Sequence, residues 1–286
     1  MVCNLQLSVL QIVAYTGWGC LFSLQPPFYP LVAEQKGAVP SQYGFVFGMS
    51  SLAAFIFSPI FGTYGNKLGP RTVFYLGAFA QGTFGIAFGF LQYVTSTWAF
   101  ITLSYLIRFL LGISEAATTG ASLAILIEMY PDRVTSLMSY TEMCVGLGYI
   151  LGPAIGSILY EIGGFILPFE VMGSICILAA FGLFCSMPKY STLSKNSTKE
   201  RRKIALSDIV NNLSILLPLV DNALNYAADG AIEAMLEPFM RKTLGTEQRE
   251  VSLVFLISGL VYLPCAPISG WVSTNCIPYF ICISLI

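Results

Sequence analysis

Long apolar stretches separated by short polar segments run along the whole chain. Most stretches hold about 20 residues or more, which is the length that an α-helix needs to cross a hydrocarbon core of about 30 Å. The pattern predicts eight membrane-spanning helices, with the chain reversing at segments rich in glycine, proline or charge. Their approximate ranges are 5–31, 42–64, 72–93, 98–128, 135–160, 164–187, 209–239 and 250–274. The last apolar segment, 277–286, is too short to cross.

The composition agrees with this pattern. Of the 286 residues, 56% are hydrophobic and only 10% are charged, whereas about 25% of the residues in a soluble domain are charged. These numbers exclude an ordinary soluble enzyme, a disordered chain and a nucleic-acid-binding protein. The sequence therefore predicts an all-α, multi-pass integral membrane protein that is surrounded by the lipid bilayer.

The inventory of reactive side chains narrows the chemistry further. The chain has no histidine, so imidazole-based proton relays, metal sites and catalytic triads are absent. The eight cysteines show no C-x-x-C spacing and lie mostly in apolar stretches, as small buried thiols do. No nucleophile–base set or phosphate-binding loop stands out. We expect no metal, no cofactor and no enzymatic activity, and any proton transfer must use carboxylates.

Basic residues are distributed unevenly between the two sides of the predicted bundle. Nine of the 14 lysines and arginines fall in the segments that follow the second, fourth and sixth helices. Four lie on the other side: Lys36, Arg241, Lys242 and Arg249. Because cytoplasmic loops of membrane proteins are enriched in Lys and Arg, the N-terminus and the segment 188–207 are predicted to be cytoplasmic.

The segment 188–207 is the one long polar, basic and Ser/Thr-rich region of the chain. A polar segment of this kind is typical of a linker between domains. We therefore predict a six-helix transmembrane domain over 1–187, a cytoplasmic basic linker over 188–207, and a partial second transmembrane domain over 208–286.

A glycine-rich, basic turn connects the second and third predicted helices, with the sequence GTYGNKLGPR over 62–71. Glycine permits the tight reversal, and the charges can interact with neighbouring helix ends. The turn resembles the loop signature G-x-x-x-D-[RK]-x-G-[RK]-[RK] of the major facilitator superfamily. The residues at its characteristic positions are Gly62, Asn66, Lys67, Gly69 and Arg71. Asn66 replaces the usual Asp of the family, and a proline replaces one basic residue.

The fourth predicted helix carries charges inside an apolar stretch. Arg108, Gly112 and Glu115 follow one another at i, i+4 and i+7, so they share one face of the helix. Charges are costly against lipid, which predicts that this face points to the bundle interior or to a cavity. The spacing resembles the family's fourth-helix motif R-x-x-x-G. Two roles remain open for Arg108 and Glu115: an internal ion pair that fixes packing, or a part in substrate or proton transfer.

The fifth predicted helix contains a row of glycines in the run GLGYILGPAIG. Gly148, Gly152 and Gly156 are four residues apart, which makes a groove where another helix can approach closely. Pro153 within the row removes a backbone hydrogen bond and kinks the helix. The run resembles the family's antiporter-type motif G-x-x-x-G-P-x-x-G. With three motifs in order, the chain is identified as a member of the major facilitator superfamily.

Within that superfamily the sequence is similar to the vesicular amine and polyamine transporter group. The similar segments are PFYP at 27–30, EMCVGLGYILGPAIG at 142–156 and AMLEP at 234–238. The aspartate that monoamine transporters carry in the first helix is missing, and Gln25 lies nearby instead. The resemblance implies a complete six-helix N-terminal half followed by about two helices of the C-terminal half.

The seventh predicted helix carries a polar stripe at strict intervals of four residues: Asp221, Asn225, Asp229, Glu233 and Glu237. Such spacing keeps side chains on one slowly turning face of a helix. Four carboxyl groups cannot face lipid cheaply, so we expect them to line a water-filled path. Desolvation and like-charge repulsion both favour the protonated form of a carboxyl group, so such a stripe can hold either protons or amines.

Two further carboxylates, Glu115 and Glu142, are predicted to extend this acidic surface in the N-terminal half. An alternative applies to the ends of the stripe: Asp221 and Glu237 would instead be solvated at the membrane interface.

Two hypotheses for function follow. The first, implied by the resemblance and the stripe, is a secondary transporter in a vesicle or plasma membrane. It would exchange protons for a small organic cation, a polyamine or amine, by alternating access. The second is a truncated, transport-incompetent product that acts, if at all, through association with other membrane proteins. It is motivated by the two helices found after the linker where the family pattern has six.

Overall fold

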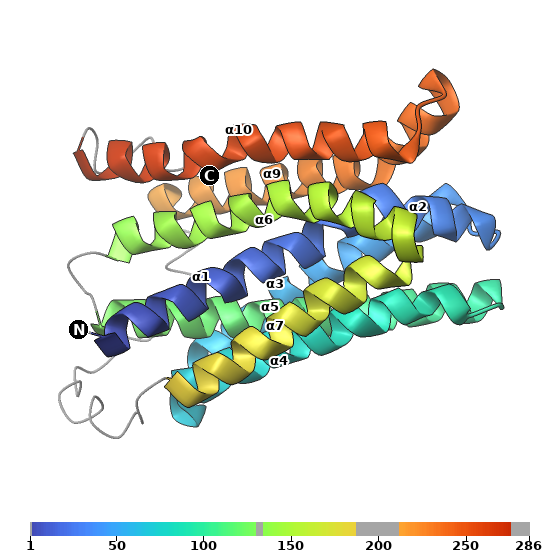
Figure 1. Cartoon of the computed structure of the whole chain (residues 1–286). Helices are drawn as coiled ribbons and strands as arrows, with labels where there is room; N and C mark the ends of the chain where they lie inside the picture. The colour runs from blue at the N-terminus through green and yellow to red at the C-terminus, as the bar shows by residue number, and fades with distance from the viewer. Residues whose placement is uncertain (1, 130–133, 187–211, 276–286) are drawn as a thin grey trace.

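Long helices that run side by side make up the molecule (Figure 1). The computed structural model describes residues 2–129, 134–186 and 212–275, and these ranges contain no strand. The helices are α1 (Val2–Ser23), α2 (Gln25–Gln35), α3 (Pro40–Leu68), α4 (Pro70–Gly89), η1 (Phe90–Tyr93), α5 (Thr97–Met129), α6 (Val134–Gly163), α7 (Ile166–Ser186), α9 (Leu213–Phe239), η4 (Met240–Leu244) and α10 (Gln248–Asn275).

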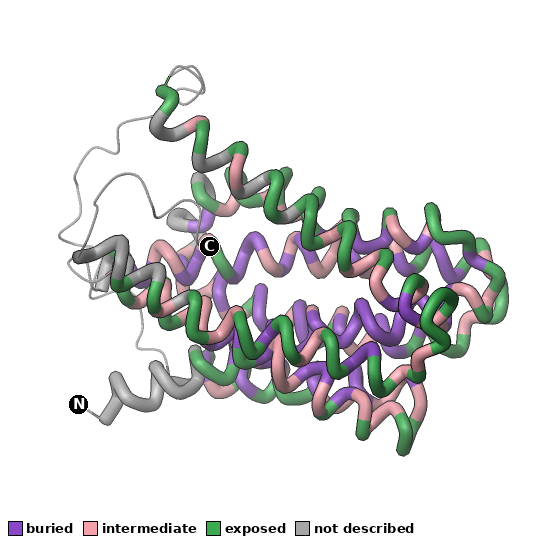
Figure 2. The backbone as a smooth tube through the Cα atoms, turned by 90° about the horizontal axis from the view of Figure 1, so that it is seen from above, coloured by how far each residue is buried: buried purple, intermediate pink, exposed green. Residues whose placement is uncertain are grey.

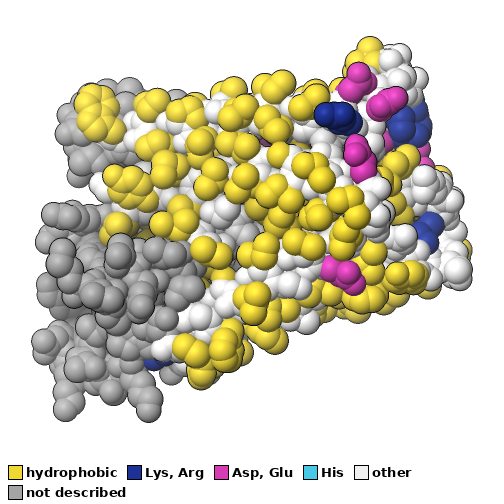
Figure 3. Space-filling model, viewed as in Figure 1, with side chains coloured by type: hydrophobic (Ala, Val, Ile, Leu, Met, Phe, Trp, Pro, Cys, Tyr) yellow, Lys and Arg dark blue, Asp and Glu magenta, His cyan; other side chains and the backbone are white. Residues whose placement is uncertain are grey.

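All eight predicted spans are helical in the structure, and the all-α prediction is confirmed. Five helical ranges are long and apolar enough to cross a membrane by length and composition: Pro40–Gly62, Pro70–Tyr93, Thr97–Ile127, Ser136–Gly163 and Ile166–Cys185. Within the described residues, α1, α9 and α10 are not among these five. The face shown in Figure 3 is covered mainly by hydrophobic side chains, as a lipid-facing surface requires.

The first predicted span is broken into two helices. Helix α1 ends at Ser23 and α2 begins two residues later. Pro26 and Pro27 open α2, and Pro30 lies inside it. A proline has no backbone N–H to donate, so it removes a helical hydrogen bond and bends the helix path. Hydropathy alone does not register this break, and for that reason the prediction of one continuous helix was wrong at this point.

The turn between α3 and α4 is shorter than predicted. Helix α3 continues through Leu68, and α4 begins at Pro70. Gly69 alone reverses the chain, with a φ of 88° that residues with a Cβ rarely adopt. Proline suits the first position of the next helix, because that position has no helical acceptor for an N–H.

Six of the predicted spans pack as one group. Helix α1 packs against α6 and α7, α4 against α5 and α7, and α3 against α5. Helix α10 lies along α6, and α9 contacts α2 and α3. Buried residues follow the middle of the bundle, and the outer helices diverge towards the end that holds the N-terminus (Figure 2). The predicted linker 188–207 falls wholly within 187–211, outside the described residues.

Candidate functional site

Arg108 is a charged residue enclosed deep inside the bundle. Helix α5 places it in the interior, where only 1% of the residue is exposed. Its guanidinium lies over two aromatic rings, 5.5 Å from the centroid of Phe22 and 5.1 Å from that of Phe47. Its Nε has no hydrogen-bond partner. The rings hold the cation in place without neutralising it, so its charge remains free to act on nearby carboxylates.

Two carboxylates from different helices act on Arg108. Glu115 lies on the same helix, and Glu233 comes from α9; both interact electrostatically with the guanidinium. Neither forms a close ion pair with it, since every N···O pair within 4.0 Å among the described residues lies elsewhere. The described residues thus show no close ion pair between Arg108 and Glu115, and the role of these two residues stays a prediction. The arrangement is an enclosed cation with one carboxylate from each predicted domain.

A small cavity lies beside Arg108, and polar groups from four helices line it. Gln25 is 2% exposed and donates its Nε2 to the Leu21 carbonyl at 3.2 Å. Its Oε1 accepts no hydrogen bond. The residues lining the cavity are Trp18, Leu21, Phe22, Gln25, Ser50, Gln81, Arg108, Leu111 and Glu115. Because buried polar atoms normally have partners, the free acceptor indicates a place for water or a polar ligand.

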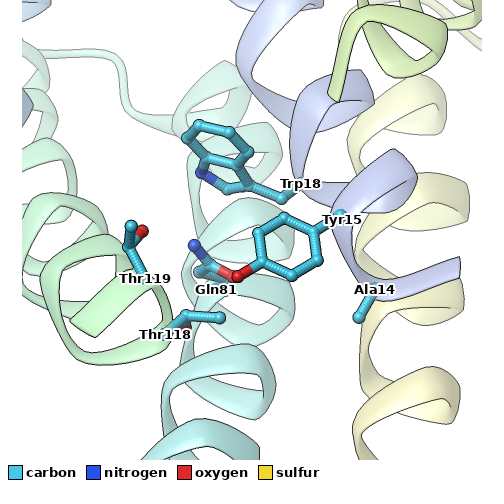
Figure 4. A pocket seen from close by; sticks show the side chains of 6 residues that line it. All are labelled: Ala14, Tyr15, Trp18, Gln81, Thr118 and Thr119. Atoms are coloured by element: carbon cyan, nitrogen blue, oxygen red, sulfur yellow. The ribbon is translucent and has the colours of Figure 1, made fainter. Parts of the chain in front are cut away.

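A second small cavity adjoins the first and shares Trp18 and Gln81 with it. Tyr15 and Trp18 extend from α1 towards Gln81 of α4, and Thr118 and Thr119 of α5 close the other side (Figure 4). The two cavities thus bring amide, hydroxyl, carboxyl and guanidinium groups near one another inside the six-helix group.

Glu142 is joined to the C-terminal helices. It lies on α6, and one of its carboxylate oxygens accepts a hydrogen bond from the Tyr262 hydroxyl of α10 at 3.1 Å. The ring of Tyr262 packs against Gly146 on the same face of α6. Glu142 therefore lies at the contact between the two predicted domains, on a helix different from Glu115 and Glu233.

The polar stripe of α9 is not uniform. Asp229 is exposed, Glu233 is half-buried and Glu237 is fully buried. At the other end, the backbone carbonyl of Asp221 accepts a bond from Asn225 at 3.0 Å, and one carboxylate oxygen of Asp221 is buried without a partner. The alternative of a solvated Glu237 is therefore wrong, and the stripe passes from an exposed stretch into the protein interior.

Glu237 belongs to a group of charges at the end of the molecule, which we name the ionic cluster: Glu34, Tyr43, Glu237, Arg241 and Lys242. Arg241 donates from Nε to Glu237 at 2.7 Å and from Nη2 to Glu34 at 2.6 Å. Lys242 donates to Glu34 at 2.7 Å, and the Tyr43 hydroxyl does so at 3.0 Å. These bonds join α2 and α3 to the end of α9. Figure 3 shows charged side chains gathered at this end.

Hydrogen bonds within the ionic cluster shift the pKa values of Glu34 and Arg241 so that both side chains stay charged. Burial alone would raise the pKa of Glu34, but the hydrogen bonds from Lys242, Arg241 and Tyr43 outweigh it and lower that pKa below its ordinary value of 4.5. Hydrogen bonds to the two glutamates likewise raise the pKa of Arg241. Both groups are therefore held in their charged forms.

The glycines of the α6 motif lie against α1. A Cβ at Gly148 would meet the Thr16 carbonyl, and one at Gly152 would meet the Ser23 side chain. Gly156 lies equally close to Leu24. The groove predicted from the sequence is present, α1 fills it, and Pro153 lies within the helix beside it. On α5, Gly112 approaches the Ser50 carbonyl of α3 in the same manner.

The residues of the predicted turn motif, 62–71, are less tightly packed than the glycines of α6. Gly62 is exposed, with open space where a Cβ would be. Arg71 donates to the Phe184 carbonyl at 2.6 Å and so joins the start of α4 to the end of α7. Asn66 and Lys67 lie in the last turn of α3, and their side chains are outside the described part of the chain.

Sequence reasoning missed Glu34, Arg241 and Lys242 as members of a site. Glu34 and Arg241 are 207 residues apart, so no local pattern relates them. The spacing of four between Glu237 and Arg241 was the one available signal, because residues so spaced are neighbours on a helix.

A bundle of long helices with an apolar surface and charges held inside it defines a multi-pass integral membrane protein. Residues 7–286 match the family model of the Major Facilitator Superfamily. The chain belongs to this superfamily, which consists of membrane transporters and not of enzymes.

Similar proteins include two named as MFS-type transporters and one named as a multidrug resistance protein. The MFS-type transporter SLC18B1 of Homo sapiens is 31% identical over 252 residues, 88% of this chain and 54% of the relative. That of Rattus norvegicus is 29% identical over 270 residues, 94% of this chain and 58% of the relative. The multidrug resistance protein MdtG of Escherichia coli (strain SMS-3-5 / SECEC) is 30% identical over 260 residues, 87% and 60% respectively. The chain thus spans a little over half the length of these relatives.

Proposed function

We propose that the protein exchanges protons for an organic cation, a polyamine or amine, by alternating access. The observation that carries this proposal is the group of charges inside the bundle. Arg108 lies on aromatic rings while Glu115 and Glu233, from the two predicted domains, act on it. Carboxylates from both domains that face one enclosed region are what a carrier needs to bind a cation from either side of the membrane.

The proposed exchange uses each carboxylate for either a proton or an ammonium group. A carboxylate removed from water needs a compensating positive charge, and a proton or an alkylammonium can supply it. When a proton neutralises one of the two carboxylates, Glu115 or Glu233, the positive charge of Arg108 compensates the remaining carboxylate. The region then has no net negative charge left to bind an organic cation. Loading with protons and loading with the organic cation therefore exclude each other, which is the requirement for antiport.

The proposal also includes the domain ranges, the orientation of the chain in the membrane and the substrate class. The domains are 1–187 and 208–286, joined by the basic linker 188–207, with the N-terminus in the cytoplasm. The ionic cluster then faces the lumen of a vesicle or the outside of the cell. The resemblance to polyamine and amine transporters supports the substrate class, and the relatives named for multidrug resistance support including bulky hydrophobic cations among the test substrates.

Transport into liposomes tests the proposal. We expect an imposed pH gradient to drive accumulation of labelled spermidine, and an agent that collapses the gradient to abolish it. Glu233→Gln should lower the proton-driven rate at least about tenfold, because it removes the carboxylate that α9 contributes to the Arg108 region. Uptake is measured by filtration over a panel of polyamines, monoamines and hydrophobic cations.

Glu161→Gln serves as the matched control, since Glu161 is an exposed glutamate near the end of α6. Its rate should match that of the unmodified protein. Cation uptake that persists unchanged after the gradient is collapsed, or in Glu233→Gln, would contradict the mechanism.

A further inference from the structure

Gln81 is a buried amide that borders both small cavities of the bundle. It lies on α4, where 4% of the residue is exposed, and it lines each cavity. None of the hydrogen bonds between described residues involves its amide. A glutamine amide has two N–H donors and an oxygen with two lone pairs, and buried groups of this kind are normally paired. The position therefore calls for a small partner that both donates and accepts.

The two cavities belong to the first predicted domain alone. The residues that line them all fall within 14–119, on helices α1 to α5. Helices α9 and α10 contribute none of them, although both pack against the six-helix group. The site around Gln81 is therefore built by one domain, and it does not need a particular position of the C-terminal helices.

Two further polar atoms of the larger cavity lack partners. Gln25 presents the acceptor Oε1, and Arg108 presents the donor Nε. The volume of this cavity that is open to water-sized molecules is about 20 Å³, which is room for one water molecule. An organic cation is far too large for it. A water molecule offers donors and acceptors together, so it suits this set of groups and the amide of Gln81.

We infer that the six-helix group holds a water site organised by Gln81, and that protons reach and leave Glu115 through this water. Glu115 lines the same cavity. In the loading step a hydronium ion in the site gives one proton to the carboxylate, which leaves a carboxylic acid and a water molecule; unloading is the reverse. The inference rests on the proposed function for the role of Glu115. It adds that protons and the organic cation use different space.

The charged groups around Glu115 come from other places than Gln81. Arg108 acts on it from the same helix, Glu142 from α6 and Glu233 from α9. Helices α1 to α4 contribute uncharged polar or aromatic side chains to the two cavities: Tyr15, Trp18, Gln25, Ser50 and Gln81. Water on this side of Glu115 is therefore held by hydrogen bonds and not by charge. Gln81 is the positioning residue, because it borders both cavities.

X-ray radiolysis of the chain in lipid nanodiscs tests the water site. Hydroxyl radicals form from bound water and oxidise the side chains beside it, and mass spectrometry measures the oxidation rates of Tyr15 and Trp18. Gln81→Leu should lower both rates about fivefold, because an apolar side chain leaves the water without its partner. Trp98 is 77% exposed and is the internal reference, with an unchanged rate.

Three more variants make the labelling test specific. Gln81→Met is a second apolar replacement that answers the question where Gln81→Leu does not fold, and it should lower the rates equally. Gln81→Asn keeps an amide and should retain most of the labelling. Thr83→Val is the matched control, because Thr83 is exposed on the same helix and its hydroxyl donates to the Phe79 carbonyl at 2.9 Å. Its rates should equal those of the unmodified chain.

Two transport measurements in liposomes test the proton role. Uptake of spermidine driven by a pH gradient requires protons to reach Glu115, whereas exchange of labelled for unlabelled spermidine at equal pH does not. Gln81→Leu should lower the first rate about tenfold and the second less than about twofold. In a Glu115→Gln background, Gln81→Leu should cause no further loss, because two residues that serve one step do not act additively.

The outcomes separate this inference from the proposed transport mechanism. Labelling of Tyr15 and Trp18 in Gln81→Leu and Gln81→Met equal to that of the unmodified chain would overturn the water site. Equal losses of proton-driven uptake and of exchange, or a full further loss in the Glu115→Gln background, would overturn its proton role. Transport that does not depend on the pH gradient leaves the labelling result standing and refutes the proposed function.

Discussion

Two arginines of this protein are compensated in opposite ways. Arg108 lies on the faces of Phe22 and Phe47, and its Nε remains unpaired. Arg241 makes close ion pairs with Glu34 and Glu237. An aromatic face attracts a cation without giving up a charge, whereas a carboxylate pair neutralises it. Arg108 can therefore respond to changes in its surroundings, and Arg241 holds parts of the structure together.

The pairing of Glu34 predicts a pH dependence of stability. The pKa of this carboxyl is lowered by its hydrogen bonds, after burial is taken into account. A group whose pKa is lower in the folded state stabilises that state above its ordinary pKa, and the stabilisation is lost as the pH falls through the lowered value. We expect the unfolding temperature in detergent to be insensitive to Glu34 between about pH 7 and pH 5.5, and to fall below about pH 4.

Glu34→Gln provides the comparison, because glutamine cannot lose a proton. The difference in unfolding temperature between this variant and the unmodified protein should be largest near neutral pH and shrink in acid. A difference that grows as the pH falls would contradict the assignment of Glu34 as the ionised partner of Tyr43, Arg241 and Lys242.

At the scale of the elements, the glycines of α6 bring its backbone close to the backbone of α1. The row of glycines brings the two helices together so closely that a methyl group has no room, as the position of Ser23 opposite Gly152 shows. Small residues are the usual means of packing helices in a membrane, where apolar side chains gain nothing from leaving lipid. The α1–α6 contact is therefore a fixed part of the six-helix group.

This contact predicts a large cost for Gly152→Ala. The added Cβ would meet the Ser23 hydroxyl and the Cys20 carbonyl, and overpacking of this kind lowers the free energy of unfolding by about 1–3 kcal/mol. Gly48→Ala is the matched control, because Gly48 is an exposed helical glycine of α3 with nothing within 4 Å of the new atom. That change should stabilise by about 0.5–1 kcal/mol.

Titration with sodium dodecyl sulfate, followed by circular dichroism, measures both variants. Equal stabilities for Gly152→Ala and Gly48→Ala would show that α1 and α6 do not meet as described.

The sequence was sufficient to locate the helices, because hydropathy and helix length are local properties. It also placed Arg108, Gly112 and Glu115 on one interior face for the same reason. It did not show the break after Ser23, although three prolines follow it, since the apolar character continues across that point. The pairing of Glu34 with Arg241 was beyond local reasoning, because it depends on how α2 and α9 meet in space.

The burial of Glu237 also could not be predicted from the sequence pattern. Its position in the stripe indicated either a water-filled path or a solvated interface, and both ideas assumed contact with water. The structure buries it completely against a basic residue one turn further along. Periodicity identifies which residues share a helical face, but the exposure of that face is decided by neighbouring helices.

At the scale of the whole molecule, the described charges are concentrated at one end and in the interior. The ionic cluster occupies the end where α2 and α9 approach one another, while the outer helices diverge at the opposite end (Figure 2). Positive charges of the sequence are more numerous on the side of the N-terminus and the segment 188–207. These two distributions lead to the proposed orientation, with the ionic cluster away from the cytoplasm.

Epitope tags test this orientation. A tag at the N-terminus and one within 188–207 should both bind antibody in cells whose plasma membrane alone has been opened with digitonin. The reason is that both segments are expected on the cytoplasmic side, whether the protein is in a vesicle or in the plasma membrane. Binding to intact cells, or binding only after all membranes are dissolved, would contradict the orientation.

The glycine row of α6 also determines how substitutions there affect the amount of folded protein. Because each glycine there meets another helix directly, a substitution with a larger residue acts first on folding. A loss of only about 1–2 kcal/mol in folding stability changes the amount of a protein in the cell several-fold, since the unfolded fraction is degraded. Substitution of Gly148, Gly152 or Gly156 should thus lower the amount of the protein in the cell, and a compound that assists folding should restore it.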